Sequence, residues 1–182
     1  MNHILTMRDN FNLVGFNDFL RFLDKFSDLK NSTIVEIGSY IGESTIMFAN
    51  KAKLVISIDP FMNGYDSNDE ASYLADLPTV VYQKYLENTA PYSNIQHIKK
   101  TSDDAVIDIK ELVDLVYIDG VHTYEQVKKD IENYRGLVKP GGFLCGHDYV
   151  NAGHLAGVYQ AVNEIFDTPD ITFCDYTWVV KL

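Results

Sequence analysis

The sequence has few cysteines, few basic residues and no long apolar run. Its two cysteines, Cys145 and Cys174, fit neither a disulfide framework nor a C-x-x-C metal or redox motif. Lys and Arg number 15 against 26 Asp and Glu, and the formal charge of −11 disfavours contact with a phosphate backbone. We therefore expect no disulfide-stapled fold and no nucleic-acid partner.

The chain also lacks the stretch of about 20 apolar residues that crosses a membrane. Residues 1–10 include Arg8 and Asp9 but not the apolar centre of a secretory signal. These absences predict a cytoplasmic protein without a membrane partner. A length of 182 residues suits one domain with one substantial core, so residues 1–182 are expected to form a single domain with a helical extension at residues 1–30.

Short β-branched runs alternate with helical patterns along the chain. Runs that are apolar on both faces predict five strands, at residues 33–38, 54–59, 95–99, 113–119 and 142–147. Residues 171–182 add two short strands around a tight reversal. Strands buried on both sides and separated by helices are typical of a parallel sheet with helices on each face. The predicted fold class is therefore Rossmann-like α/β.

Apolar residues at helical spacing predict three main helices. The first is expected to begin at the N-cap Asn17 and to end near Leu29, with Phe16, Phe19, Leu20, Leu23 and Phe26 on its apolar face. The second is expected to begin with a capping box of Thr123 and Gln126. After the second helix, residues 140–142, Pro-Gly-Gly, would turn the chain into the fifth strand. The third helix is expected to have an apolar stripe from Val158 to Ile165.

Residues 61–78 fit no strand pattern and are rich in Asp, Asn, Ser and Tyr. A loop of this length is often a lid, so we expect an active-site loop here. Tyr65 and Tyr73 within it offer a stacking surface for an acceptor or ordinary packing, and both readings stay open. For Tyr82 and Tyr85, three residues apart on an expected helix, core packing is the favoured interpretation.

The first strand runs into a glycine turn and a helix, with Glu36, Gly38 and Gly42 in sequence. Glycines there let the backbone pass close to a ligand, and the amides at the following helix start, near Ser44, favour an anionic group. A dinucleotide fingerprint would require glycine at Tyr40 and Glu43, which argues against a nicotinamide-dependent oxidoreductase. A plain strand-to-helix turn is the alternative interpretation.

Two further places suit cofactor contacts. Asp59 ends the second strand, where a ribose diol would lie. Ser102 and Asp103 follow the third strand and suit contact with an adenine, although Ser102 serves equally well as an ordinary helix cap.

Four segments together resemble class I S-adenosylmethionine-dependent methyltransferases: residues 35–38, 57–61, 116–124 and 140–149. Within that class the chain resembles a subgroup of small-molecule O-methyltransferases with an Asp-Gly-x-His-x-Tyr motif, related to enzymes that methylate macrolide and other sugars. The resemblance implies a seven-stranded, mostly parallel sheet whose last strand is antiparallel. It also implies S-adenosylmethionine as cofactor, with Glu36, Gly38 and Ser39 near its methionine portion and Asp59 on its ribose.

Asp119 and Asp148 end the fourth and fifth strands, at the edge where α/β sheets bind ligands. Adjacent strands lie about 4.8 Å apart, so two acids there would repel each other unless a cation, a shared proton or a basic residue intervened. Oxygen ligands suit Mg²⁺ or another divalent ion, and the resembling sugar methyltransferases use such ions. The alternative interpretation is that both acids are structural: Asp119 would then be a turn residue, and Asp148 would cap the next turn.

Histidines flank both acids in sequence. His147 stands where the resembling enzymes tend to carry another acid, so it is a candidate ligand or second base, although neighbouring strand residues point to opposite faces. His122 precedes the capping Thr123 and is a candidate general base. A solvated His122 is the alternative. His154 is expected to line an acceptor pocket without catalysing, and His3 and His97 are expected to be incidental.

The predicted reaction is transfer of a methyl group to a hydroxyl oxygen of a small molecule, such as a sugar, with His122 removing the proton and Asp119 and Asp148 holding an ion. The alternatives are a methyltransferase that needs no ion, a nicotinamide-dependent oxidoreductase, and a module that binds the cofactor without chemistry. The sequence leaves a homo-oligomer open.

Overall fold

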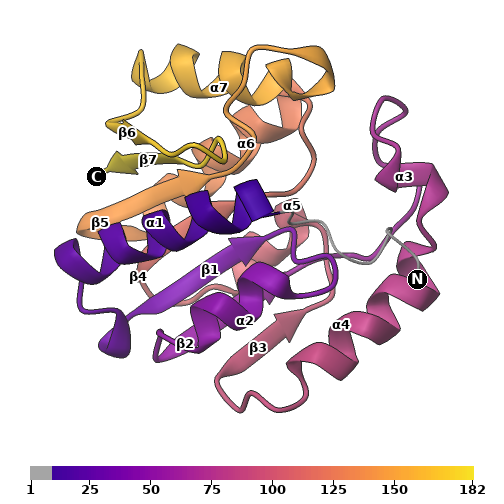
Figure 1. Cartoon of the computed structure of the whole chain (residues 1–182), viewed down its shortest axis with the longest axis horizontal. Helices are drawn as coiled ribbons and strands as arrows, with labels where there is room; N and C mark the ends of the chain where they lie inside the picture. The colour runs from indigo at the N-terminus through magenta and orange to yellow at the C-terminus, as the bar shows by residue number, and fades with distance from the viewer. Residues whose placement is uncertain (1–9) are drawn as a thin grey trace.

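The structure, a computed structural model, describes residues 10–182 and is built on one seven-stranded sheet (Figure 1). Its order is β3-β2-β1-β4-β5-β7-β6, where β1 to β5 run parallel and β7 runs antiparallel to both of its neighbours. This confirms the predicted Rossmann-like α/β class. The strands are β1 (Thr33–Ile37), β2 (Leu54–Ile58), β3 (Ile95–Ile98), β4 (Val113–Ile118), β5 (Val138–Gly146), β6 (Ile171–Thr172) and β7 (Trp178–Lys181).

Helices cover both faces of the sheet because successive strand residues point to opposite sides. Val116 packs in the core shared with α6 and α7, whereas Tyr117 packs with Phe19 and Phe48 in the core under α1 and α2. In Figure 1, α1 and α2 lie in front of the sheet. The α-helices are α1 (Asn10–Phe26), α2 (Glu43–Ala49), α3 (Ala71–Leu74), α4 (Tyr82–Thr89), α5 (Ser102–Ala105), α6 (Tyr124–Tyr134) and α7 (Ala156–Phe166).

The first helix is longer than the sequence indicates. It is already formed at Asn10, so Asn17 is not its cap but an interior residue whose Nδ2 donates to the carbonyl of Leu13 at 2.7 Å. Phe26 is 64% exposed and does not belong to the buried face, which the other four predicted residues do form. Residues 1–9 of the expected N-terminal extension lie outside the described residues.

The fifth strand begins earlier than expected, at Val138, so that residues 140–142 lie within it rather than before it. The pairing with β4 shifts register between Val113 and Leu115. A Cβ on Gly142 would come 2.6 Å from the carbonyl oxygen of Asp114, so glycine permits the close approach of the two strands there. The Pro-Gly-Gly signal therefore marks an irregular strand, not a turn.

The segment between β2 and α4 contains structure that the sequence pattern did not indicate. It includes α3 and a π-helical turn at Leu77–Val81, and Phe61, Leu77 and Val81 are buried against Tyr85. Apolar anchors therefore fix this segment at the carboxyl edge of the sheet. None of the helices in the described part of the chain is long and apolar enough to span a bilayer.

Candidate active site

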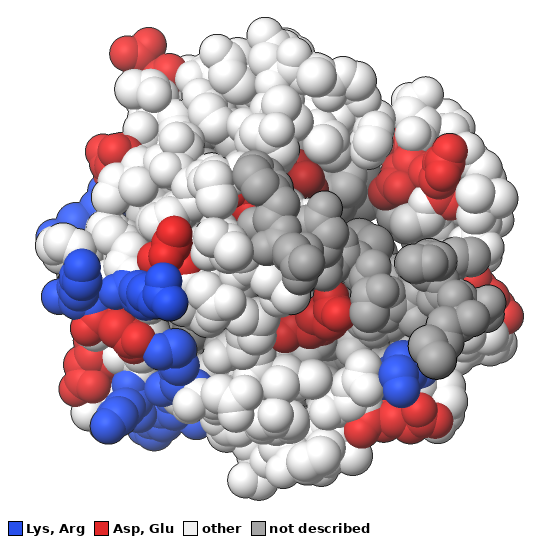
Figure 2. Space-filling view, viewed as in Figure 1, with Lys and Arg blue, Asp and Glu red and all other residues white. Residues whose placement is uncertain are grey.

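A cavity of about 840 Å³ opens at the carboxyl edge of the strands. It is lined by strand-end residues such as Gly38, Asp59 and Asp119, and by Tyr65 and Asp69 of the segment after β2. The described lining residues include seven acids but no Lys or Arg. In Figure 2, Lys and Arg gather mainly at the lower left, where Figure 1 places the start of β1. The cavity is therefore a negative site that suits a cationic ligand.

The glycine turn after β1 is tied to the end of β2. Asp59 accepts hydrogen bonds from the backbone N–H groups of Ser39 and Tyr40, both at 3.0 Å, and of Phe61 at 2.7 Å. Gly38 has a φ of 85°, and a Cβ on it would lie 2.1 Å from the carbonyl oxygen of Asp119. Burial raises the pKa of Asp59 more than these backbone donors lower it. The turn is thus held by a buried acid and packed directly against the end of β4.

Most of the predicted cofactor residues line the cavity, whereas two do not. Gly38, Ser39, Ser44, Asp59, Ser102 and Asp103 line it. Glu36 lies behind the wall, fully buried, and accepts a hydrogen bond from Thr45 Oγ1. Gly42 is the left-handed residue before α2 and faces the Tyr85 ring. The structure therefore gives Glu36 and Gly42 roles in holding the turn.

Ser102, at one end of the cavity, faces the start of α6. Thr101, not Ser102, caps α5, because its side chain accepts from Asp104 N. Thr123 accepts from Gln126 N as expected, but the Gln126 side chain does not complete the capping box. Its Nε2 donates instead to Ser102 Oγ at 3.2 Å and to Asp130 Oδ1 at 3.0 Å. Ser102 and Gln126 thus form a polar wall with the buried Asp130.

Asp130 is expected to make stability depend on pH. Burial raises its pKa from 3.8 to about 6, against the lowering effect of Ser102 and Gln126. The folded protein therefore binds more protons than the unfolded chain between about pH 4 and pH 6, and the free energy of unfolding falls as pH rises through that window. Asp130→Asn should stabilise the protein at pH 8 by up to about 3 kcal/mol, and by less near pH 4.

Urea denaturation at pH 4.5 and pH 8 measures this difference. Asp108→Asn is the matched control, since Asp108 is exposed and paired with Lys100 at 2.6 Å. It should show no comparable gain at pH 8. An Asp130→Asn gain of equal size at both pH values would contradict the assignment.

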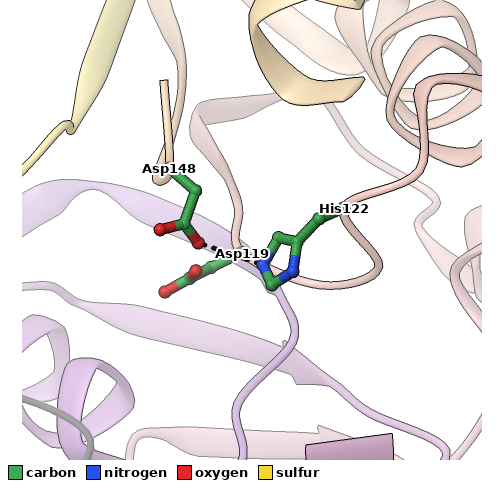
Figure 3. A group of neighbouring side chains, drawn as sticks. All are labelled: Asp119, His122 and Asp148. Atoms are coloured by element: carbon green, nitrogen blue, oxygen red, sulfur yellow. Dashed lines mark ion pairs between the residues drawn. The ribbon is translucent and has the colours of Figure 1, made fainter. Parts of the chain in front are cut away.

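Asp119, His122 and Asp148 converge beside the cavity (Figure 3). One ligand atom from each lies within 4.8 Å of the others, and His122 Nε2 is 3.0 Å from Asp148 Oδ2. Strands β4 and β5 are neighbours, with Ile118 paired to Gly146, which meets the condition under which the two acids come close. The group therefore has the composition and spacing of a divalent-cation site.

His147 joins the same group from the other side. Its Nδ1 lies 3.1 Å from Asp148 Oδ1 and 3.8 Å from Asp119 Oδ1. The sequence left open whether His147 and Asp148 share a site, and the structure brings their side chains together, because β5 ends at Gly146 and Asp148 has a φ of 60°. The alternation of directions holds only within the strand. Asp148 is thus flanked by two imidazoles.

The charges of this group depend on one another. Burial alone would raise the pKa of Asp148, but its hydrogen bonds with His122 and His147 hold that pKa well below its usual range. Burial lowers the His122 pKa, and the hydrogen bond to Asp148 together with the charges of Asp148, Asp119 and Asp69 outweighs this effect and raises it. The acids therefore favour a positive charge in their midst, on an imidazole or on a bound cation.

The structure adds two acids that the sequence interpretation missed. Asp69, 9% exposed, has Oδ2 at 3.8 Å from His122 Nδ1 and accepts a hydrogen bond from Tyr65 Oη at 2.7 Å. Asp175, fully buried, has Oδ2 at 3.7 Å from His147 Nε2. Each acid is far from its histidine in sequence, so no spacing links the two residues. The sequence showed only that Asp69 belongs to a long loop and Asp175 to a hairpin turn.

Of the remaining tyrosines and histidines, some line the cavity and others do not. His154 lines the cavity, with its ring 5.8 Å from that of His122. Tyr65 also lines it, whereas Tyr73 is 56% exposed. Tyr82 and Tyr85 pack with Phe61 and His97 in a cluster of rings, which confirms the core interpretation of the tyrosine pair.

Residues 35–149 match the family described as "Methyltransferase domain". The chain belongs to this family. The matched range runs from within β1, just before the glycine turn, to just past Asp148 after β5, so it includes most of the strand ends that line the cavity. The prediction of a class I, S-adenosylmethionine-dependent methyltransferase is confirmed at the level of the family, and the sugar-related subgroup stays a prediction.

Two curated relatives cover most of this methyltransferase domain. The uncharacterized protein R132 of Acanthamoeba polyphaga mimivirus is 33% identical over 145 residues, which are 73% of this chain and 58% of that protein. The uncharacterized protein y4gI of Sinorhizobium fredii (strain NBRC 101917 / NGR234) is 27% identical over 136 residues, 72% of this chain and 15% of that protein. The methyltransferase domain thus spans less than two thirds of either relative.

Solved structures share the fold at low sequence identity. The O-methyltransferase NovP has a TM-score of 0.70 at 14% identity, covering 95% of this chain and 82% of that one. The N-methyltransferase NodS of Bradyrhizobium japonicum WM9 has a TM-score of 0.61 at 19% identity, covering 95% of this chain and 96% of that one. An rRNA methylase of Streptococcus thermophilus has a TM-score of 0.60 at 14% identity, covering 97% of this chain and 99% of that one. The fold therefore serves several acceptor classes, and the lack of a nucleic-acid partner and a cytoplasmic location stay predictions.

Proposed function

We propose that this methyltransferase domain transfers the methyl group of S-adenosylmethionine to a hydroxyl oxygen of a small molecule, such as a sugar, with the help of a divalent cation. The observation that carries the proposal is the convergence of Asp119, His122 and Asp148 at a cavity that also includes the glycine turn. The bound cofactor supplies an electrophilic methyl group on a sulfonium.

The size and the charge of the cavity support such a cofactor. Its volume of about 840 Å³ lies in the range of small-molecule sites and leaves room for an acceptor. Gly38 lets the turn pack against the end of β4 and lines the cavity, and we assign the ribose to the side of the cavity lined by Asp59. The acidic lining favours a cationic sulfonium over the two phosphates of a nicotinamide dinucleotide.

The donor set fits a hard divalent cation. Asp119 and Asp148 supply carboxylate oxygens, and an imidazole of His122 or His147 lies within reach of both acids. Mg²⁺ and Mn²⁺ favour oxygen ligands and accept an occasional imidazole. A cation held there would lower the pKa of an acceptor hydroxyl.

His122 is the proposed base. Asp148 Oδ2 lies 3.0 Å from its Nε2 and orients the ring beside the cavity, and we assign to this imidazole the uptake of the proton from the acceptor hydroxyl. Asp69 Oδ2, at 3.8 Å from Nδ1, stabilises the imidazolium that results. A cation held by Asp119 and Asp148 would offset the effect of these acids on the pKa of His122 and would favour the neutral imidazole before the transfer. If His147 supplies the third ligand, His122 is free for this role.

Removal of the cation is the direct test. Formation of S-adenosylhomocysteine is measured with a panel of sugars and phenols, before and after dialysis against a chelator. We expect turnover to fall by at least about tenfold and to return with Mg²⁺ or Mn²⁺. Binding of S-adenosylhomocysteine, measured by calorimetry, should not change.

Each rival predicts a different result. Full turnover in chelator would support a methyltransferase without an ion. Methylation of amines in preference to the matching alcohols would overturn the hydroxyl acceptor. Cofactor binding without turnover on any acceptor would support a module that binds without chemistry.

A further inference from the structure

We propose that Asp175 is a positioning residue that orients His147 toward Asp119 and Asp148, so that His147 serves as a ligand of the divalent cation. The inference rests on the proposed function, because it assigns a supporting group to the same cation site. It concerns a residue outside the cavity lining, in the turn between β6 and β7.

The imidazole of His147 lies between two sets of carboxylates. Its Nδ1 faces Asp148 Oδ1 at 3.1 Å and Asp119 Oδ1 at 3.8 Å, and its Nε2 faces Asp175 Oδ2 at 3.7 Å. An acid on the far nitrogen of a metal-binding histidine fixes the ring and its tautomer, and it strengthens the near nitrogen as a ligand. Asp175 has the position of that far acid.

Asp175 is a costly residue to bury without such a task. It is fully buried, and it accepts two hydrogen bonds from Thr177, from the backbone N–H at 3.2 Å and from Oγ1 at 3.0 Å. A buried carboxylate is strongly destabilising unless it is well paired. On α1, Gly15 leaves room for it, since a Cβ there would lie 2.5 Å from the Asp175 side chain. The fold thus encloses this acid beside the imidazole.

The backbone holds the two residues at a fixed separation. Strand β7 pairs with β5, with Trp178 opposite Gly146, so the turn before β7 lies next to the end of β5. Tyr149 N also donates to the carbonyl of Tyr176 at 3.0 Å. The segments carrying His147 and Asp175 are therefore bound together on both sides of the pair.

A role as a turn residue is the competing explanation, because Asp175 also caps its own turn through Thr177. The two explanations differ in what Asp175→Asn changes. Asparagine keeps the size and an oxygen acceptor for Thr177, but it loses the negative charge that faces Nε2. A turn role predicts a change in stability only. A positioning role predicts a change in metal affinity.

The experiment titrates Mn²⁺ into the full-length protein with S-adenosylhomocysteine present and counts free Mn²⁺ by electron paramagnetic resonance. We expect Asp175→Asn to raise the Mn²⁺ Kd by about 10- to 100-fold. The affinity for S-adenosylhomocysteine should stay within about twofold of wild type. Asp170→Asn is the matched control, because Asp170 belongs to the same hairpin but accepts from Lys181 N at 2.8 Å, and it should leave the Mn²⁺ Kd unchanged.

A second measurement needs no variant. In wild-type protein loaded with Mg²⁺ and labelled with ¹⁵N-histidine, NMR should show the His147 proton on Nε2 and a bare Nδ1. The opposite tautomer would overturn the proposal, and so would wild-type Mn²⁺ affinity in Asp175→Asn. If the wild-type protein binds no Mn²⁺, both the role of Asp175 and the proposed cation site are overturned. Binding of S-adenosylhomocysteine would in that case still support methyl transfer.

Discussion

Replacing Asp119 by asparagine is expected to abolish methyl transfer and to leave cofactor binding almost unchanged. Asp119 lies at the end of β4, within the group formed with His122 and Asp148, and it lines the cavity. Asparagine keeps the shape but removes a charge that would hold the cation and stabilise the protonated base. Loss of either effect lowers kcat by about 10² to 10⁴, and loss of both brings turnover to the background level.

The control is Asp114→Asn, an identical change at the other end of the same strand. Asp114 accepts from Thr33 N and pairs with Lys139, each at 2.8 Å, outside the cavity. Its loss should cost about 1 kcal/mol of stability or less and little turnover. Turnover by coupled assay and S-adenosylhomocysteine affinity by calorimetry are compared for both variants. A large affinity loss in Asp119→Asn, with turnover partly kept, would contradict the assignment.

The fold and the edge that carries the site could be predicted from the sequence because both depend on local patterns. Apolar runs located the central strands, and parallel strands place their carboxyl ends at one edge. Asp59, Asp119 and Asp148 were therefore expected at the same edge of the sheet, and all three line the cavity there. The glycine turn was also readable, since a glycine after a buried strand marks a close backbone approach.

Features that depend on contacts between distant segments could not be predicted. Asp69 and Asp175 lie 53 and 28 positions from the histidines they face, and no periodicity joins them. The convergence of His147 with Asp148 depends on one left-handed residue. Phe26 was assigned to the buried face by spacing alone, but it is the last residue of α1 and is exposed. These contacts and exposures are determined by tertiary packing, which overrides local propensity.

Replacing Gly38 by alanine should destroy the cofactor site. Two costs combine there, because the residue has a φ of 85° and an added Cβ would lie 2.1 Å from the carbonyl oxygen of Asp119 and 2.7 Å from Gly120 Cα. The contacts are backbone atoms, so relief requires the end of β1 to move away from the end of β4. We expect a loss of at least about 3 kcal/mol in stability and a cofactor affinity lower by at least about 100-fold.

Gly64→Ala separates the two costs. Gly64 also has a positive φ, of 77°, and also lines the cavity, but an added Cβ would have no heavy atom within 4 Å. It should lose only the conformational cost of about 1 to 2 kcal/mol. Chemical denaturation and calorimetry with S-adenosylhomocysteine measure both variants. If Gly38→Ala matched Gly64→Ala in stability and kept its affinity, the close approach of the turn to β4 would not be what shapes the cofactor site, and the glycine would serve only its own backbone conformation.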